Sequence, residues 1–203
     1  MRVLVFDRTC VRTGGGLTIP WFVGSHLYRA LRRFDRVKGV ASWSEALAWL
    51  GAIDQPIDEL QYWGHGRWGR FLVDKEALTT DSLLANHEHH AGMRALRDRL
   101  APGGLVWFRT CSAFGTWRGM AFAEALADFL GARVAGHTHV IGFHQSGLHG
   151  LVPGARAHWH PAEGLADGTP DEPAKAKGSW PWAARTITCL HGAVPEAWFR
   201  APS

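Results

Sequence analysis

A cysteine and a histidine stand at equivalent places in two similar stretches of this chain. Residues 105–119, LVWFRTCSAFGTWRG, begin with four large apolar residues and reach Cys111 just after them. Residues 60–66, LQYWGHG, form another apolar run, which ends at His65 and Gly66. Short apolar runs are typical of strands buried on both faces of a parallel sheet, and open α/β sheets present ligands at the carboxyl ends of such strands. The sequence therefore predicts a thiol and an imidazole at the functional edge of one sheet.

These two side chains together suit nucleophilic catalysis. Cysteine attacks only as a thiolate, and a neighbouring imidazole can supply that state. A helix beginning soon after Cys111 would favour the negative sulfur. Gly66 lets a substrate carbonyl approach the backbone, so its N–H can donate to a developing oxyanion. Taken singly, Cys111 is explained equally well as a small buried residue and His65 as an ordinary loop histidine. The pairing at two strand ends is what predicts a catalytic dyad.

The pair of motifs resembles the caspase-like cysteine peptidases, a group that includes caspases, metacaspases, gingipains, separase and several bacterial caspase-like domains. The resemblance consists of a strand ending in His-Gly and a next core strand ending in Cys, and it extends over residues 1–138 in the order of elements. It implies a His65–Cys111 dyad, with the N–H groups of Gly66 and Cys111 as oxyanion donors. It also implies a caspase-like fold and endopeptidase activity on a protein or peptide substrate, without a cofactor.

The resemblance further implies a pocket that holds the side chain before the cleaved bond. That pocket would lie beside the loop after the first strand and the residues preceding the cysteine, which here carry Arg8, Arg12 and Arg109. Guanidinium groups bind carboxylates through two parallel hydrogen bonds, so cleavage after acidic residues is expected. Trp180 is a further candidate for the wall of a substrate groove. Thr110 precedes the cysteine, where the family commonly has a small alanine.

The hydrophobic pattern predicts one α/β domain over residues 1–203, with three α-β-α layers and a mostly parallel sheet. Apolar runs predict strands at residues 3–6, 37–40, 60–63, 105–108, 134–136 and 186–190. Residues 71–73 are predicted as an edge strand or hairpin, whereas residues 142–178 lack periodicity and are predicted as loops with a possible hairpin. Strands that alternate with helices indicate parallel pairing through right-handed crossovers.

Apolar residues at helical spacing predict the buried face of each helix. The first stripe consists of Val23, Leu27, Ala30, Leu31 and Phe34. The second consists of Trp43, Ala46, Leu47 and Leu50, and it follows a capping-box signature formed by Ser42 and Glu45. A short helix is predicted at residues 93–100, and a longer one has a buried face at Phe122, Leu126, Phe129 and Leu130.

Composition narrows the possible partners and compartments. The net charge of +4 on 203 residues comes from scattered arginines, which does not predict a nucleic-acid surface. No apolar segment approaches the roughly 20 residues that span a bilayer, so no membrane partner is predicted. The first residues turn polar too early for a signal-peptide core, and three cysteines make a disulfide framework improbable. A cytoplasmic protein is therefore expected, and the oligomeric state stays open.

Two other functions remain as alternatives. His137 with His139, and His158 with His160, form His-x-His pairs that could chelate a metal on a strand. No acidic residue lies at matching spacing, so a metal hydrolase is the less favoured alternative and no metal site is predicted. The other alternative is a non-catalytic caspase-like module that binds a partner protein through the same cleft. Gly14, Gly15 and Gly16 between the first strand and a helix have the outline of a phosphate-binding turn, but the patterns G-x-x-x-x-G-K-[ST] and G-x-G-x-x-G are both missing, so a flexible loop is the favoured interpretation. The G-x-S-x-G pattern of serine hydrolases does not occur in the chain.

Overall fold

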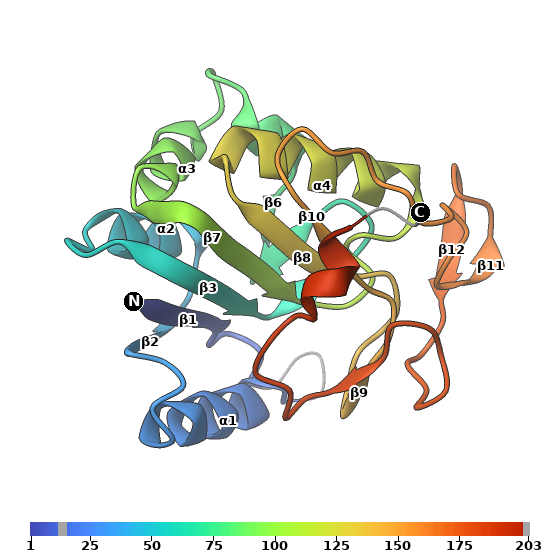
Figure 1. Ribbon diagram of the computed structural model, residues 1–203, viewed down its shortest axis with the longest axis horizontal. Coiled ribbons are helices and arrows are strands. Elements are labelled where there is room, and N and C mark those ends of the chain that lie inside the picture. The colour runs from blue at the N-terminus through green and yellow to red at the C-terminus, as the bar shows by residue number, and fades with distance from the viewer. Residues whose placement is uncertain (12–15, 201–203) are drawn as a thin grey trace.

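A six-stranded sheet forms the centre of the molecule (Figure 1). The computed structural model describes residues 1–11 and 16–200. In spatial order the strands are β10 (Leu148–Leu151), β8 (Arg133–His137), β7 (Leu100–Arg109), β3 (Ile57–Trp63), β1 (Arg2–Asp7) and β2 (Arg36–Val40). Neighbouring strands are parallel except at β10, which runs antiparallel to β8. The predicted mostly parallel α/β sheet is confirmed, and so are the strands predicted at 3–6, 37–40, 60–63, 105–108 and 134–136.

Helices lie on both faces of this sheet (Figure 1). They are α1 (Thr18–Ala30), α2 (Trp43–Gly51), α3 (His90–Arg97) and α4 (Thr116–Leu130). Figure 1 shows α2, α3 and α4 above the sheet and α1 below it, where the carboxy-terminal segment covers the rest of the lower face. That segment contains β13 (Ile187–Thr188) and the 3-10 turn η2 (Glu196–Phe199). Among the described residues, no helix has the length and apolar character needed to cross a bilayer.

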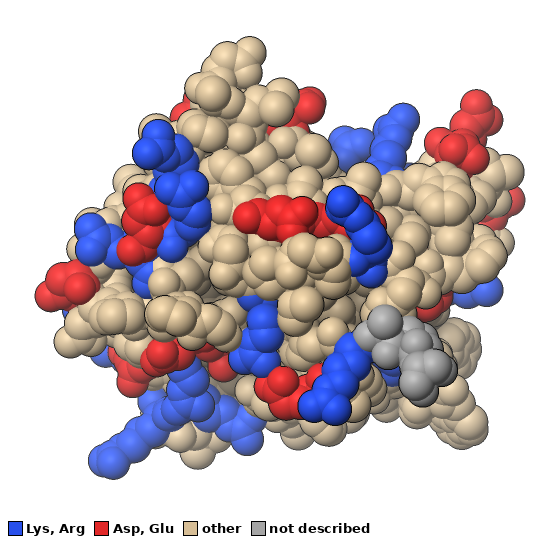
Figure 2. All heavy atoms as spheres, turned by 45° about the horizontal axis from the view of Figure 1, so that its top comes forward, with Lys and Arg blue, Asp and Glu red and all other residues tan. Residues whose placement is uncertain are grey.

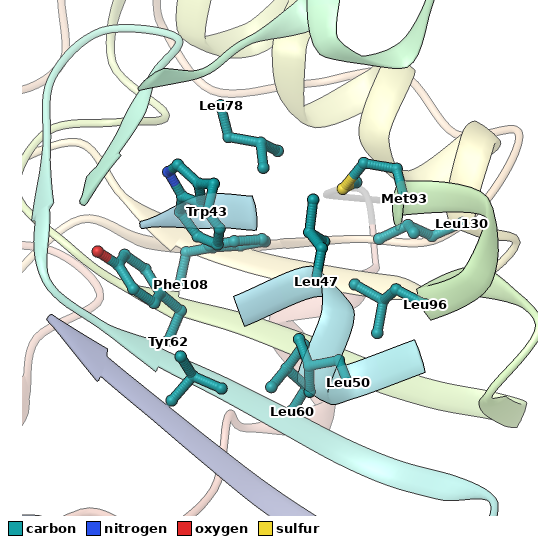
Figure 3. A pocket seen from close by; sticks show the side chains of 11 residues that line it. Trp43, Leu47, Leu50, Leu60, Tyr62, Leu78, Met93, Leu96, Phe108 and Leu130 are labelled. Carbon is teal, nitrogen blue, oxygen red and sulfur yellow. The ribbon is translucent and has the colours of Figure 1, made fainter. Parts of the chain in front are cut away.

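The layer formed by α2, α3 and α4 encloses the larger hydrophobic core (Figure 3). The predicted stripe of α2 is buried, and the Ser42 hydroxyl accepts the N–H of Glu45 at 2.9 Å, which confirms the predicted helix start. Figure 3 shows Leu47 of α2, Met93 of α3 and Leu130 of α4 converging above Phe108 of the sheet. Only about 20 Å³ of space remains among these side chains, and its lining is apolar. Such a gap leaves no polar partner for water and is too small for a ligand.

The predicted burial of the first apolar stripe is wrong for α1. Its side chains at Val23, Leu27 and Leu31 are 58%, 50% and 59% exposed, and Ala30 is exposed as well. The helix is instead anchored through Ser25 and Tyr28, which are its buried residues. Tyr28 packs on Phe34 and Trp63, and its hydroxyl donates to the carbonyl of Cys189 at 2.6 Å. Tyr28 reaches both an aromatic cluster and a backbone acceptor. It is this residue, and not the aliphatic stripe, that sets the rotation of α1 about its axis.

Several further elements lie outside the expected positions. The sixth strand, β10, falls in the region predicted as loops, because His149 and Gly150 interrupt its apolar pattern. The predicted last strand is reduced to β13, which pairs with β9 (His144–Gln145) outside the central sheet. The predicted helix at 93–100 begins earlier, as α3, and Leu100 already belongs to β7.

Short hairpins complete the chain. A three-stranded sheet consists of β4 (His65–Gly66), β5 (Phe71–Val73) and β6 (Glu76–Leu78), which confirms the hairpin predicted at residues 71–73, and the 3-10 turn η1 (Thr80–Leu83) follows it. The hairpin allowed for within residues 142–178 is formed by β11 (Leu165–Gly168) and β12 (Pro173–Ala176).

The order of the strands reverses between β1 and β3. From β1 the chain moves to the edge strand β2, and from β3 it moves through β7 to β8 on the other side. At such a reversal the loops after the two strands separate toward opposite faces, leaving a crevice at their carboxyl ends. The loops after β1, β3 and β7 therefore border the part of the molecule most suited to a site.

Candidate functional site

His65 and Cys111 follow neighbouring strands at the same offset. In the parallel pair β3–β7, Trp63 is opposite Arg109, so each of the two residues comes two positions after the last pair. Side chains alternate between the faces of a sheet, and Trp63 and Arg109 both face α1. Residues two positions further along continue on that face. The register thus brings His65 and Cys111 to the same end and the same side of the sheet.

Two backbone hydrogen bonds hold the loops of these residues against each other. The turn between β4 and β5 has Trp68 and Gly69 at its corners, both with positive φ, the geometry of a tight hairpin turn. The N–H of Trp68 donates to the carbonyl of Ser112 at 3.1 Å, and the N–H of Gly69 donates to that of Ala113 at 2.8 Å. The hairpin that begins at His65 is therefore docked on the loop that begins at Cys111.

Both side chains line one cavity of about 400 Å³. Its walls come from α1 and the turn before it, from the ends of β3 and β7, and from residues 141–145 and 189–190. The lining is mostly apolar, and Arg109 and Gln145 supply polar groups beside the thiol and the imidazole. A concave, largely apolar cavity of this size with a few convergent polar groups has the general character of a ligand site.

The ring of His65 contacts a cysteine that the sequence analysis left without a role. Its Nε2 lies 3.2 Å from Sγ of Cys10, in the loop after β1, and its ring meets Trp21 of α1 edge-on at 5.3 Å. Cys10 is buried, and it is not among the described residues that line the cavity. The signal that could have identified it is topological, because β1 adjoins β3 at the point where the strand order reverses.

Cys111 is half-buried, and its sulfur faces a backbone carbonyl. Its Sγ lies 3.9 Å from the oxygen of Ile141, at the limit of a sulfur hydrogen bond. Burial raises the pKa of the Cys111 thiol, which lowers the thiolate fraction at neutral pH. The helix α4 begins five residues later, at Thr116. Because the thiolate is the reactive form, a neighbouring base that takes the thiol proton would favour reaction at this sulfur.

The backbone around the pair leaves Gly66 available as a donor. In an antiparallel hairpin, hydrogen-bonded and non-hydrogen-bonded pairs alternate. The N–H of Arg67 donates to the carbonyl of Arg70, so these two residues form a hydrogen-bonded pair. The next pair, Gly66 and Phe71, is therefore a non-hydrogen-bonded pair, and the N–H of Gly66 points away from β5. Gly66 also has to be a glycine, since a Cβ there would lie 2.5 Å from Oγ1 of Thr110.

In the loop after Cys111, by contrast, the N–H groups of Ser112 and Phe114 are committed. They donate to the carbonyls of His139 and His137 at 2.8 and 3.0 Å, at the end of β8. These two N–H groups cannot also bind an oxyanion. The role of the N–H groups of Gly66 and Cys111 as oxyanion donors stays a prediction.

Arg109 is a buried cation at the base of the cavity. Its side chain is 4% exposed and donates to Gln145 Oε1 from Nε and Nη2, at 3.0 and 2.8 Å, and to the carbonyls of Cys189 and His191. It also lies over the rings of Trp63 and Trp107. Within residues 1–11 and 16–200 no carboxylate forms an ion pair with it. Burial lowers the pKa of Arg109 to about 10, so it remains charged at neutral pH. A buried cation without a counter-ion favours an anionic ligand group.

The other predicted pocket residues do not join Arg109. Arg8 borders a separate hollow between α1 and β2, where its Nη2 lies 3.3 Å from Glu45. Trp180 is 67% exposed and lies outside the cavity lining. Arg12 lies outside the described residues. Of the arginines considered, the structure places Arg109 with the thiol and the imidazole.

Of the two predicted histidine pairs, His137 and His139 belong to a buried hydrogen-bond network behind the cysteine loop, whereas His158 is half-buried and His160 is exposed. His149 Nε2 lies 2.8 Å from Glu163, whose carboxylate also accepts the hydroxyl of Thr138 at 2.9 Å. His137 bonds the carbonyl of Ser146, and burial lowers its pKa to about 3. In the described part of the chain, no cluster of three or more His, Cys, Asp or Glu side chains could hold a metal ion. The network supports the end of β8, whose carbonyls hold the loop after Cys111.

In comparisons with known proteins, no protein-family model, no curated protein and no solved structure matches this chain.

Proposed function

We propose that this protein is a cysteine endopeptidase that cleaves peptide bonds after acidic residues, with a caspase-like arrangement of its site. The observation that carries the proposal is the shared cavity, in which the half-buried thiol of Cys111, the imidazole of His65 and the unpaired cation of Arg109 meet. Among the described residues, the sulfur of Cys10 adjoins the imidazole but Cys10 does not line the cavity. Cys189 also lines the cavity, and its carbonyl accepts hydrogen bonds from Tyr28 and Arg109. We assign the nucleophile to Cys111, which follows the strand next to the one that carries His65.

In the proposed reaction the substrate's acidic side chain occupies the base of the cavity and pairs with Arg109. His65 takes the thiol proton, and the sulfur of Cys111 attacks the carbonyl carbon to form a tetrahedral intermediate. The N–H groups of Gly66 and Cys111 donate to its oxyanion. As the carbon–nitrogen bond breaks, His65 returns the proton to the leaving amine, and a thioester remains. Water then attacks the thioester with His65 as base, releasing the carboxylic acid and restoring the thiol.

The contact between His65 and Cys10 gives the imidazole a third partner. A catalytic base is commonly held by a further group that fixes its tautomer and orientation. With Nε2 of His65 directed at Cys10, Nδ1 is the nitrogen left for the thiol of Cys111. Cys10 is therefore proposed as a positioning residue and Cys111 as the nucleophile.

The second candidate function is a non-catalytic module that binds an acidic peptide in the same cavity. It is favoured by one observation, namely that burial raises the pKa of the Cys111 thiol and so disfavours the reactive thiolate. The role of Arg109 is common to both functions. They differ only in whether Cys111 forms a covalent bond with the ligand.

A peptide bearing a cysteine-directed acyloxymethyl ketone distinguishes the two. Peptides ending in Asp, Asn or Lys before the reactive group are incubated with the protein, and the modified residue is located by mass spectrometry. The peptidase predicts labelling of Cys111, fastest with Asp and abolished in Cys111→Ala. Reaction at Cys10 alone would contradict the assignment of the nucleophile. No covalent labelling, together with equal binding of an Asp peptide by wild type and Cys111→Ala in calorimetry, would establish the binding module.

A further inference from the structure

Exposed apolar side chains gather on one side of this molecule. In the described part of the chain, all the exposed large hydrophobic residues apart from Val11, Leu84 and Trp117 lie in three segments, residues 17–31, 140–143 and 180–190. Figure 1 shows α1, the region of β9 and the chain between β12 and β13 along the lower side of the molecule. The cavity joins these segments, since Leu27 of α1, Phe143 and Leu190 all contribute to its wall. We call these three segments the apolar rim.

The centre of the apolar rim is the outward face of α1. Ile19, Val23 and Leu27 follow one another at intervals of four, so they lie one above the other along the helix. They are 61%, 58% and 50% exposed, and the buried residues Ser25 and Tyr28 lie on the opposite side. The helix therefore carries its aliphatic stripe outward and its polar serine inward, the reverse of an ordinary surface helix. A stripe of this kind has a stable environment only when something apolar covers it.

The charge pattern indicates what covers it. Residues 8–34, 129–162 and 173–195, which include the apolar rim, contain no Asp or Glu. The same stretches contain Arg29, Arg32 and Lys177 as exposed cations. By contrast, Figure 2 shows both signs of charge interspersed on the face where the top of Figure 1 comes forward. Segments that present aliphatic and tryptophan side chains together with cations, and that contain no acidic residue, are complementary to the boundary of an anionic bilayer.

We propose that this protein binds anionic membrane surfaces through the apolar rim, with the outward face of α1 inserted among the lipids and Arg29 and Arg32 near the phosphate groups. This is interfacial binding, which needs no membrane-spanning segment, and it departs from the sequence-based expectation of no membrane partner. A second copy of the chain fits less well, because its own apolar rim contains no Asp or Glu that could pair with Arg29 and Arg32. Nucleic acid fits less well too, because bases stack on aromatic rings and α1 presents mainly aliphatic side chains.

Vesicle flotation tests this proposal on the full chain. Vesicles of phosphatidylcholine alone are compared with vesicles containing about one quarter phosphatidylglycerol, in about 0.1 M salt. Wild type should float with the anionic vesicles at least about tenfold more than with the neutral ones. Val23→Asp combined with Leu31→Asp should lower this binding about tenfold or more, because two charges would have to enter the apolar region. Neither residue contributes to the wall of the cavity.

A matched control keeps the result specific. Leu84 and Trp117 are 54% and 51% exposed outside the apolar rim, so Leu84→Asp with Trp117→Asp adds the same charge elsewhere and should leave vesicle binding unchanged. Arg29→Gln with Arg32→Gln should weaken binding and reduce its sensitivity to salt. Circular dichroism on heating checks that each variant is folded. Cys111→Ala should bind vesicles like wild type, so that loss of peptidase activity and loss of membrane binding are separate outcomes.

Three results would overturn the proposal. The first is equal flotation of wild type with neutral and anionic vesicles. The second is unchanged flotation of the Val23→Asp, Leu31→Asp variant. The third is binding to an acidic amphipathic peptide of leucine and glutamate, lost in that variant, without binding to either vesicle, which would assign the apolar rim to a protein partner.

Discussion

The loops after β1 and β7 each bring a thiol toward His65, and they do so in opposite ways. Cys10, after β1, lies 3.2 Å from the imidazole but is 4% exposed and outside the cavity wall. Cys111, after β7, lines the cavity but has the carbonyl of Ile141 as its hydrogen-bond partner. Cys10 therefore contacts the imidazole but is not accessible to a ligand, whereas Cys111 is accessible to a ligand but has no hydrogen bond to the imidazole.

Cys10 and Cys111 each meet one of two requirements of nucleophilic catalysis. A nucleophile needs a base within reach and a path to the substrate, and catalytic hydrogen bonds commonly tighten only when a substrate is bound. A small side-chain rotation can bring Cys111 into a hydrogen bond with His65. Such a rotation cannot give Cys10, which is buried and does not line the cavity, access to a substrate. The comparison therefore favours Cys111 as nucleophile and assigns Cys10 to the orientation of the imidazole.

The largest expected effect distinguishes the two thiols directly. Cys111→Ala should abolish hydrolysis of an acidic peptide substrate, a loss on the order of 10³-fold or more, because it removes the proposed nucleophile. Cys10→Ala should reduce kcat by about tenfold at most, since it removes a positioning contact. Steady-state kinetics of both variants checks this. A larger loss in Cys10→Ala than in Cys111→Ala would reverse the assignment.

Removal of the imidazole should have the next largest effect. His65→Ala should lower the rate of acylation by about 10² to 10⁴-fold, the usual contribution of a general base. If the imidazole acts on Cys111 through Nδ1, then Cys10→Ser should retain most of the activity, because a hydroxyl can also hold Nε2. Single-turnover kinetics measures both effects. Unchanged acylation in His65→Ala would show that Cys111 reacts without this base.

Replacement of the buried cation should change selectivity. Arg109→Gln should reduce the preference for Asp over Asn in the substrate by about tenfold to a hundredfold, since a charge-assisted hydrogen bond is lost. The same variant loosens the hydrogen bonds that Arg109 donates to Cys189 and His191, so its melting temperature should also fall. Competition between the two peptides measures the selectivity. A preference that survives the substitution would place the acidic side chain elsewhere.

The smallest expected effect is a displaced pH profile for the reaction of the two thiols with iodoacetamide. The thiolate is the reactive form, and burial raises the pKa of Cys111, so less thiolate exists at neutral pH than in an exposed cysteine. Alkylation of Cys111 should therefore be slow at neutral pH and increase as the pH rises above about 8.5, the ordinary thiol pKa. Cys10 should react after Cys111 throughout, because it is buried. Alkylation of Cys111 that has levelled off by neutral pH would contradict the direction of this shift.

The sequence was informative where burial is nearly complete. Runs such as residues 105–108 have apolar side chains on both faces, and only a strand in the centre of an α/β sheet accommodates them. The capping signature at Ser42 and the stripe of α2 agree with each other, and the structure confirms both. The offset of His65 and Cys111 from their strands was also predictable, because parallel strands present their carboxyl ends at the same edge.

The sequence was misleading where one polar contact outweighs an apolar pattern. The stripe of α1 has the same spacing as that of α2, yet Tyr28 turns the opposite side of α1 toward the sheet by reaching the carbonyl of Cys189. The strand β10 was missed because its buried polar residue, His149, is satisfied by Glu163 from a distant hairpin region. Neither partner lies near in sequence, so no local pattern could indicate the contact.

By itself, the sequence determined the class of fold and the two strand ends at which a thiol and an imidazole stand. Only the tertiary structure decided that Arg109 joins them while Arg8 does not, that Cys10 contacts the imidazole, and that the aliphatic face of α1 is open to its surroundings. Periodicity records which side chains share a face, whereas long-range contacts decide which way that face is turned.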